Sequence, residues 1–111
     1  MALTHVIAGQ PVPIQPLGPR LQGAKTSALF KSQDLELIHL VLLQGKSLPP
    51  HKVAGEITIH CLEGRLEVSV DGHSQVLAPG QLLFLQRNAL HGVTALEDAS
   101  GLVTIALRSG S

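Results

Sequence analysis

The chain is poor in the residues on which nucleic-acid binders and membrane-surface proteins depend. It contains no Trp and no Tyr, and its only Phe residues are Phe30 and Phe84, so it lacks the stacking platforms of single-strand binders. Eight Lys and Arg residues balance eight Asp and Glu residues, which leaves no basic field for a phosphate backbone or an anionic lipid surface. Neither nucleic acid nor a membrane is therefore an expected partner.

Cysteines, long apolar runs and a secretory leader are also missing or scarce. Cys61 is the only cysteine, so no disulfide can form within the chain. The first residues, MALTHVIAGQ, lack the basic start and the apolar core of a signal peptide. No apolar stretch approaches the length that spans a bilayer. We therefore expect a soluble protein of the reducing cytoplasm.

What the chain does contain is a Pro-rich start followed by a β-rich body. Its 111 residues suit one domain with one core. Residues 9–23 hold four prolines and three glycines, a composition that predicts an extended surface arm. We divide the chain into this arm, residues 1–24, which belongs to the same domain or contacts a second copy, and a β domain, residues 25–111.

From Thr26 onward, short runs of Leu, Ile and Val alternate with turn residues, and no pattern predicts a stable helix. Asp71-Gly72 is typical of a type I′ hairpin turn, which would place Leu66, Val68 and Val70 on one face. So many short strands favour an all-β sandwich or barrel. The predicted strands are 26–31, 35–42, 50–53, 56–62, 65–70, 74–77, 82–85, 91–95 and 102–107.

His51 and His91 are the first candidates for a functional site. They are forty residues apart, and each follows a glycine that could end a turn. Imidazole is the commonest metal-binding side chain, and it titrates nearest to neutral pH. We predict that two distant hairpins deliver these imidazoles to one pocket.

Two motifs resemble those of the cupin family, in particular small single-domain bacterial cupins of the RmlC-like type. The first runs GKSLPPHKVAGEITIHCLEG, in which the family's glycine, His-x-His, glutamate and second glycine fall on Gly45, His51, Val53, Ile57 and Gly64. In the second motif the family's glycine and histidine fall on Gly80 and His91, whereas its proline, glycine and asparagine are replaced. The resemblance extends from about Thr26 to Leu107.

This resemblance implies an antiparallel jelly-roll barrel, also called a double-stranded β-helix, that is usually dimeric. It also implies a divalent transition metal, Fe, Mn, Zn or Ni, held by the motif histidines and glutamate. Only His51 and His91 match that ligand set, because Val53 and Ile57 cannot ligate.

Glu56 and His60 are the residues that could complete the metal site. If Ile57, Ile59 and Cys61 face the interior, Glu56 and His60 face outward, as in an ordinary half-buried strand. A bulge at Ala54-Gly55 would shift the strand by one residue and turn both inward. The sequence leaves both orientations open.

Other titratable residues have simpler interpretations. His39 is expected to be a strand residue with a satisfied hydrogen bond, and Cys61 an inert core thiol. Glu63 and Arg65 flank Gly64 and are expected to form an exposed polar pair.

Three functions fit these observations. The chain could be a metal-dependent oxygenase or isomerase that uses His51 and His91 with His60 or Glu56. It could instead be a non-catalytic barrel that holds a small ligand against Leu83, Leu85 and Ile57 or Thr58. Thirdly, it could be a structural barrel that serves only to assemble a homodimer.

Overall fold

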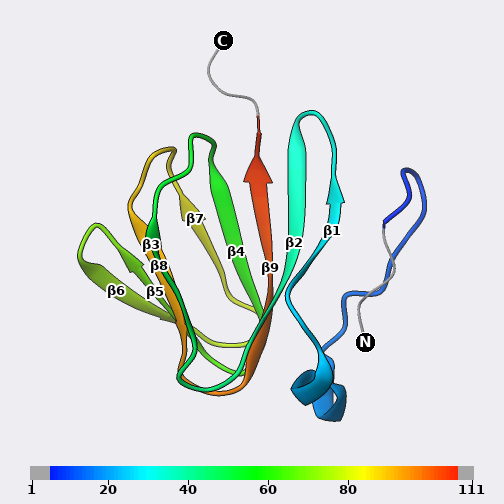
Figure 1. Cartoon of the computed structure of the whole chain (residues 1–111), viewed down its shortest axis with the longest axis horizontal. Coiled ribbons are helices and arrows are strands. Elements are labelled where there is room, and N and C mark those ends of the chain that lie inside the picture. Colours follow the sequence, from blue (N-terminus) through cyan, green and yellow to red (C-terminus); the bar gives the residue numbers. More distant parts are fainter. Residues whose placement is uncertain (1–5, 108–111) are drawn as a thin grey trace.

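The computed structural model describes residues 6–107, which form antiparallel strands and one short 3-10 helix, η1 (Gly18–Gly23) (Figure 1). The strands are β1 (Ser27–Lys31), β2 (Leu35–Leu42), β3 (Ser47–His51), β4 (Ile57–Glu63), β5 (Leu66–Val70), β6 (His73–Leu77), β7 (Leu82–Leu85), β8 (His91–Ala95) and β9 (Ala99–Ala106). No helix within residues 6–107 is long and apolar enough to cross a membrane. A cytoplasmic location stays a prediction.

The strands form two sheets that pack face to face. Five strands pair in the order β1-β2-β9-β4-β7, and the other four pair in the order β3-β8-β5-β6. The chain passes repeatedly from one sheet to the other, so neighbours within a sheet are mostly distant in sequence. This arrangement confirms the predicted all-β, antiparallel jelly roll.

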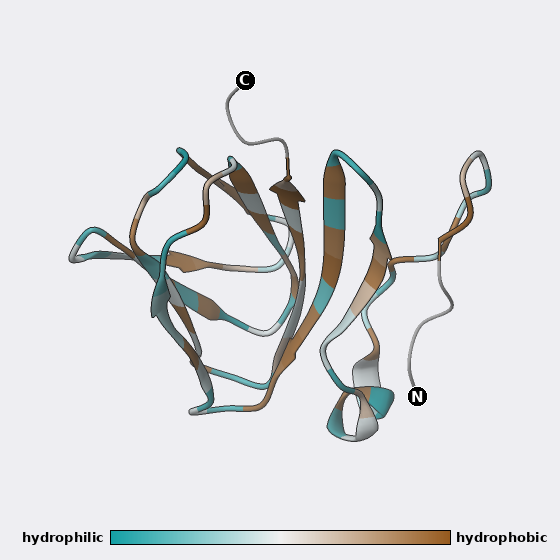
Figure 2. Ribbon diagram, turned by 45° about the horizontal axis from the view of Figure 1, so that its top comes forward, coloured by the Kyte–Doolittle hydropathy of each residue, from teal (hydrophilic) through white to brown (hydrophobic). Residues whose placement is uncertain are grey.

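The hydrophobic core lies between the two sheets. Leu40 and Ile59 of the five-stranded sheet are almost completely buried, as are Leu66 and Val68 of the four-stranded sheet. The long strands carry most of the apolar residues, whereas the turns that join them are largely hydrophilic (Figure 2). Burial of apolar area between the sheets is therefore the main force that holds the jelly roll together.

Two tight turns match their sequence signals. Asp71 and Gly72 join β5 to β6 with φ values of 48° and 87°, as a type I′ turn requires. Leu66, Val68 and Val70 consequently contact the core from one face of β5. Asn88 has a φ of 63°, in the left-handed region that Asn tolerates better than most residues.

Four predicted strands, 26–31, 56–62, 65–70 and 74–77, differ from the structure by one residue at one or both ends, and two more, 50–53 and 102–107, begin three residues too late. The strand predicted at 50–53 is β3, which instead ends at His51, and its register shifts between Leu48 and His51, across the two prolines. Proline is tolerated there because β3 is an edge strand. The strand predicted at 102–107 is β9, which begins at Ala99. The small residues at its start are weak β-formers, but they pair along the backbone with β2.

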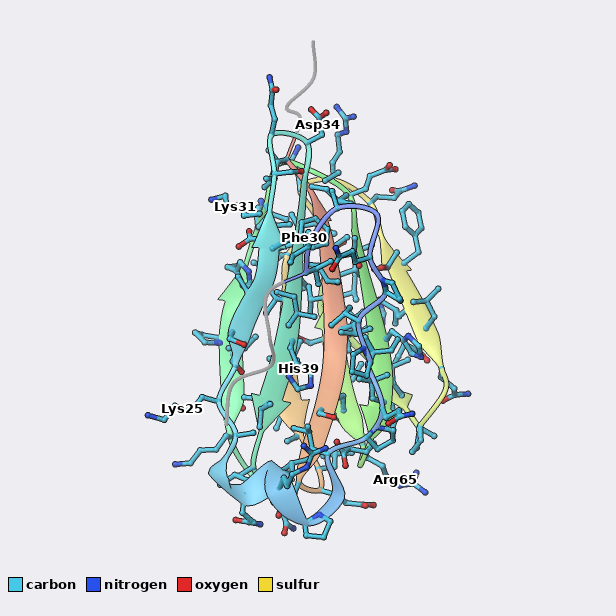
Figure 3. The ribbon with its side chains drawn as sticks, turned by 90° about the vertical axis from the view of Figure 1, so that its right-hand side faces the viewer. Lys25, Phe30, Lys31, Asp34, His39 and Arg65 are labelled. Atoms are coloured by element: carbon cyan, nitrogen blue, oxygen red, sulfur yellow. The ribbon has the colours of Figure 1, made fainter. Side chains whose placement is uncertain are left out.

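The N-terminal arm lies on the outer face of the five-stranded sheet. Leu17 and Leu21, from η1 and its start, pack on Val41 of β2. The Glu63 carboxylate accepts hydrogen bonds from the backbone amides of Leu17 and Gly18, at 2.8 and 3.0 Å. In Figure 3 the helix is seen on the same face of the sheet as His39. The arm is therefore fixed to the domain around η1, and again at Val6, whose amide donates a 3.0 Å hydrogen bond to the carbonyl of Leu29 in β1.

Candidate functional site

A cavity of about 270 Å³ opens between the two sheets. Most of its wall is aliphatic, and the only polar side chains in it are two histidines and one threonine. It is lined by Thr26, Ile38, Leu40, Leu48, His51, Ile57, Ile59, His91, Val93, Val103 and Ile105. Residues from five strands, β2, β3, β4, β8 and β9, together with Thr26 just before β1, thus build one apolar hollow inside the barrel.

The structure brings His51 and His91 together at this cavity. His51 ends β3 and His91 begins β8, and the two residues are direct partners in the antiparallel pairing. Their ring centroids are 4.6 Å apart, with the ring planes tilted by 48°. His51 is exposed and His91 is only 4% exposed, so the pair extends from the rim of the cavity into its wall.

Both imidazoles are oriented by the same local hydrogen bond. Nδ1 of His51 lies 3.2 Å from the carbonyl oxygen of Pro49, and Nδ1 of His91 lies 3.1 Å from that of Ala89. A carbonyl oxygen can only accept, so Nδ1 donates in each ring. In a neutral ring the other nitrogen, Nε2, is then an acceptor. No group of residues 6–107 hydrogen-bonds to either Nε2 atom.

His60 and Glu56 lie apart from this pair. Ile57 and Ile59 line the cavity, so the intervening side chains of β4 point to the outer face of the sheet. His60 lies there between Leu82 of β7 and Leu102 of β9. Glu56 is exposed, just before β4 begins. Of the two orientations that the sequence allowed, the structure has the ordinary one.

Gly55 explains this orientation. A Cβ atom at this position would lie 1.6 Å from the carbonyl oxygen of Ala106, so only glycine can pass so close to the end of β9. One residue later, the Ala106 amide donates a 2.9 Å hydrogen bond to the Glu56 carbonyl. These contacts set Ile57 opposite Ile105, which turns Ile57 rather than Glu56 toward the cavity.

The residues at the cavity do not fit a complete protein-bound metal centre. The two imidazoles have the usual arrangement of metal ligands, since Nδ1 is held by a backbone carbonyl and Nε2 is free. The other two ligand positions are Val53, which packs against the core, and Ile57. Within residues 6–107, no three side chains of His, Cys, Asp or Glu gather closely enough to hold a metal ion.

Several lining residues were missed at the sequence level, and two were misplaced. Ile38 and Leu40 of β2 and Val103 and Ile105 of β9 line the cavity. In β2 and β9 these residues alternate with outward-facing residues, and this alternation predicts that they face the interior. It does not predict which strands lie beside the histidines. Leu83 and Leu85, which were expected in the wall, pack instead in the core.

Two buried titratable residues, Cys61 and His39, are not part of the cavity wall. The thiol of Cys61 is fully buried, and burial raises its pKa, as expected of an inert core cysteine. His39 is 2% exposed, and burial lowers its pKa against the opposing effect of Glu63. Among residues 6–107, its Nε2 finds no hydrogen-bond partner, so the satisfied hydrogen bond predicted for His39 is not formed there.

Glu63 and Arg65 do not form the expected exposed pair. Arg65 instead contacts Glu97 at 3.0 Å on the surface. Glu63 accepts hydrogen bonds from the Leu17 and Gly18 amides and from the Ser100 hydroxyl. Burial raises the pKa of Glu63, but these three hydrogen bonds, with a contribution from His39, outweigh that effect and lower its pKa overall.

Comparison with known proteins identifies the same fold. A curated relative, the "Pectin degradation protein KdgF" of Dickeya dadantii, is 29% identical over 83 residues, which cover 73% of this chain and 74% of that protein. An RmlC-like cupin from Desulfovibrio desulfuricans is 29% identical, with a TM-score of 0.68 and coverage of 74% and 80% of the two chains. A cupin superfamily protein from Desulfitobacterium hafniense is 15% identical, with a TM-score of 0.77 and coverage of 96% and 98%.

The family match itself covers most of the jelly roll, from within β2 to the end of β9. Cupin domains match residues 38–106, which include every cavity-lining residue except Thr26. Together with the two antiparallel sheets, this match shows that the chain belongs to the cupin family.

Proposed function

We propose that this chain binds a small molecule inside the barrel, with His51 and His91 as the polar anchor. The observation that carries the proposal is a pair of free Nε2 atoms on adjacent rings at an otherwise apolar cavity. A concave apolar site with a few convergent polar groups is the usual form of a small-molecule site. The backbone hydrogen bonds at Nδ1 hold both rings in place before a ligand arrives, which reduces the entropic cost of binding.

Both imidazoles are reached from the barrel interior without rearrangement of the sheets. They are paired on neighbouring strands, so the distance between the rings is set by the backbone rather than by flexible side chains. The wall opposite them is built from β2, β4 and β9, which pair along their length. The site is therefore rigid on both sides.

A divalent metal on the same two imidazoles is the second candidate. The anchored Nδ1 atoms favour it, because metal-binding histidines commonly donate their other N–H to a carbonyl or carboxylate. Two protein ligands leave the remaining positions to water or to the small molecule, so we expect weak binding of Fe, Mn, Zn or Ni. An oxygenase or isomerase activity would require such a metal to be retained.

One experiment separates these two candidates. The full chain is titrated with benzoate, phenol, hexanoate and D-galacturonate in EDTA, and the imidazole and Ile59 methyl NMR signals are followed. We expect saturable shifts for at least one probe, and their loss in the His51→Gln/His91→Gln variant. His73→Gln, on the exposed β6, is the matched control and keeps binding. If none of the four probes shifts these signals in EDTA, metal-independent binding is wrong.

Metal binding is measured directly in the same variants. Calorimetric titration of the EDTA-stripped chain with Zn²⁺, Mn²⁺, Ni²⁺ and, without oxygen, Fe²⁺ should give affinities that depend on both histidines. Retention of near one equivalent of metal through gel filtration would show a stronger site than two imidazoles can provide, and would favour the enzyme.

A second copy of the chain is the protein partner that we propose. Leu82 and Phe84 of β7 are 61% and 56% exposed on the outer face of the five-stranded sheet, next to His60 and Thr58. Adjacent exposed apolar residues of this kind mark interaction surfaces. Light scattering at micromolar concentration should give the mass of a dimer, and Phe84→Asp should shift it toward that of a monomer. A monomeric unsubstituted chain would contradict this proposal.

A further inference from the structure

The polar groups that the cavity offers define the chemical class of its ligand. Given the small-molecule site proposed above, we propose that the cavity takes a compact, largely apolar molecule with a single hydroxyl donor, of the alkylphenol type, and rejects carbohydrates. The inference rests on that proposed function, and it follows from an inventory of the hydrogen-bonding groups in the wall.

Thr26 cannot serve the ligand. Its hydroxyl lies 3.0 Å from the carbonyl oxygen of Val41 as a donor and 2.8 Å from the amide of Val41 as an acceptor. The Thr26 hydroxyl thus bonds both backbone groups of Val41, as a residue of a neighbouring strand would, and has no donor hydrogen left for a ligand. The only polar side chains of the wall left for a ligand are His51 and His91.

The backbone of the wall opposite the histidines is also occupied. Ile38 of β2 pairs with Val103 of β9, and Ile57 of β4 pairs with Ile105, so the amides and carbonyls of these strands are used within the sheet. What they present to the cavity is aliphatic side chain. Any polar group of a ligand placed against them remains without a hydrogen-bond partner.

A carbohydrate would suffer most from such a wall. Each hydroxyl buried without a partner weakens binding by about tenfold or more, because it gives up its hydrogen bonds to water. A monosaccharide carries several hydroxyls around its ring, and two Nε2 atoms cannot satisfy them. A ligand related to pectin, which the name of the Dickeya relative suggests for that protein, is therefore a poor match for this wall.

The histidine pair selects the polar group of the ligand. With Nδ1 donating to the backbone, a neutral imidazole presents Nε2 as an acceptor, so the group that binds must donate. The two rings are neighbours, with centroids 4.6 Å apart, so a single hydroxyl proton meets one of the two Nε2 atoms. One donor on an apolar body satisfies the buried His91, while His51, which is exposed, can hydrogen-bond to water.

The cavity volume limits the size of that body. A cavity of about 150 Å³ holds benzene, so the volume of about 270 Å³ here corresponds to about eleven non-hydrogen atoms. A substituted phenol is within this limit, whereas a disaccharide is far beyond it.

Three probes that differ in their polar groups test the inference on the full chain in EDTA. 4-Ethylphenol has the apolar body and the donor, ethylbenzene has the body alone, and D-galacturonate has many polar groups. NMR titration should show saturable shifts at Ile59 and Val103 with 4-ethylphenol. We expect ethylbenzene to bind at least about tenfold more weakly and D-galacturonate not to saturate at millimolar concentration.

Two variants localise the binding. His51→Gln/His91→Gln should reduce the affinity for 4-ethylphenol to that for ethylbenzene. Phe30→Ala changes a separate hollow, formed with Val6 and Ala8, and should leave the affinity unchanged.

The outcomes distinguish this inference from the proposed function. Binding of D-galacturonate as tight as that of 4-ethylphenol, with the same histidine dependence, would overturn the ligand class but leave a histidine-anchored small-molecule site. Equal affinity for ethylbenzene and 4-ethylphenol would overturn the role of the donor group. No cavity shift with any of the three probes would overturn both proposals.

Discussion

The inside and the outside of the jelly roll place histidine in opposite environments. On the inside, His51 and His91 of the four-stranded sheet line the cavity, and each donates Nδ1 to a backbone carbonyl. On the outer face of the five-stranded sheet, His39 is 2% exposed and its buried Nε2 has no hydrogen-bond partner within residues 6–107. The same side chain therefore lines a ligand site in one place and is a buried residue with a lowered pKa in the other. Strand parity, rather than residue type, decides between them.

The largest expected effect comes from giving the inner face a carboxylate. Ile57→Glu would place the family's glutamate beside His51 and His91, which makes a two-histidine, one-carboxylate site. Without metal, a buried charge should reduce the free energy of unfolding by about 3 kcal/mol or more. With Zn²⁺ or Mn²⁺ we expect much of this stability to return, and an affinity about a hundredfold above that of the unsubstituted chain.

Urea unfolding with and without metal, together with calorimetric titration, measures both effects. Ile57→Gln is the matched control, because glutamine has nearly the same shape as glutamate but no charge. This variant should gain no metal affinity. If Ile57→Glu binds metal no better than Ile57→Gln, the cavity does not hold the two imidazoles in ligand geometry.

On the outer face, Glu63 should contribute the next largest effect. Its carboxylate accepts three hydrogen bonds that hold η1 and Ser100, so Glu63→Gln should reduce the free energy of unfolding by about 1–3 kcal/mol at neutral pH. Because these bonds lower the pKa of Glu63 in the folded state, their contribution is present above its ordinary pKa and is lost as the pH falls through the lowered value.

Urea unfolding between pH 3 and pH 7 tests this linkage. The unsubstituted chain should lose stability in acid more steeply than Glu63→Gln. Glu97→Gln is the control, because its contact with Arg65 is exposed and should contribute little. If Glu63→Gln and Glu97→Gln lost stability equally steeply in acid, Glu63 would not be the source of the pH dependence.

His39 provides the sharpest test of the comparison between the faces. Burial lowers its pKa, so the unfolded chain takes up a proton before the folded chain does, and stability should fall as the pH drops below about 6.5. His39→Leu should remove this part of the pH dependence and change stability at neutral pH by about 1 kcal/mol or less, in either direction. His51→Leu should keep this pH dependence. If His51→Leu removed it and His39→Leu did not, His39 would not be its source.

The smallest effect on stability is expected for single substitutions at the cavity rim and at the outer histidine of β4. His51→Gln and His60→Gln should each change the free energy of unfolding by about 0.5 kcal/mol or less. Only His51→Gln should weaken the binding of 4-ethylphenol, by about tenfold, since His60 lies outside the cavity. Equal loss of binding in both variants would contradict the separation of the two faces.

Local patterns were sufficient to predict most of the fold. β2, β7 and β8 have the predicted bounds because turn residues end their apolar runs. The start of β9 was missed because Ala99, Ser100 and Gly101 are weak β-formers that are held by pairing with a distant strand. Long-range pairing of this kind leaves no local signal.

The site was less predictable than the fold. Motif spacing identified His51 and His91, but the orientation of Glu56 and His60 depends on how closely Gly55 approaches Ala106, some fifty residues away in sequence. The role of Glu63 was missed for a similar reason, since its partners include Leu17 and Gly18 in the arm. A single sequence does not contain these distances.

The carbonyl oxygens of Pro49 and Ala89 have one more consequence for the cavity. They accept hydrogen bonds from Nδ1 of His51 and His91, so a ring that turned over would place a carbon atom against its carbonyl and lose this bond. The residue two positions before each histidine therefore decides, through the backbone alone, which edge of the imidazole is left for other partners.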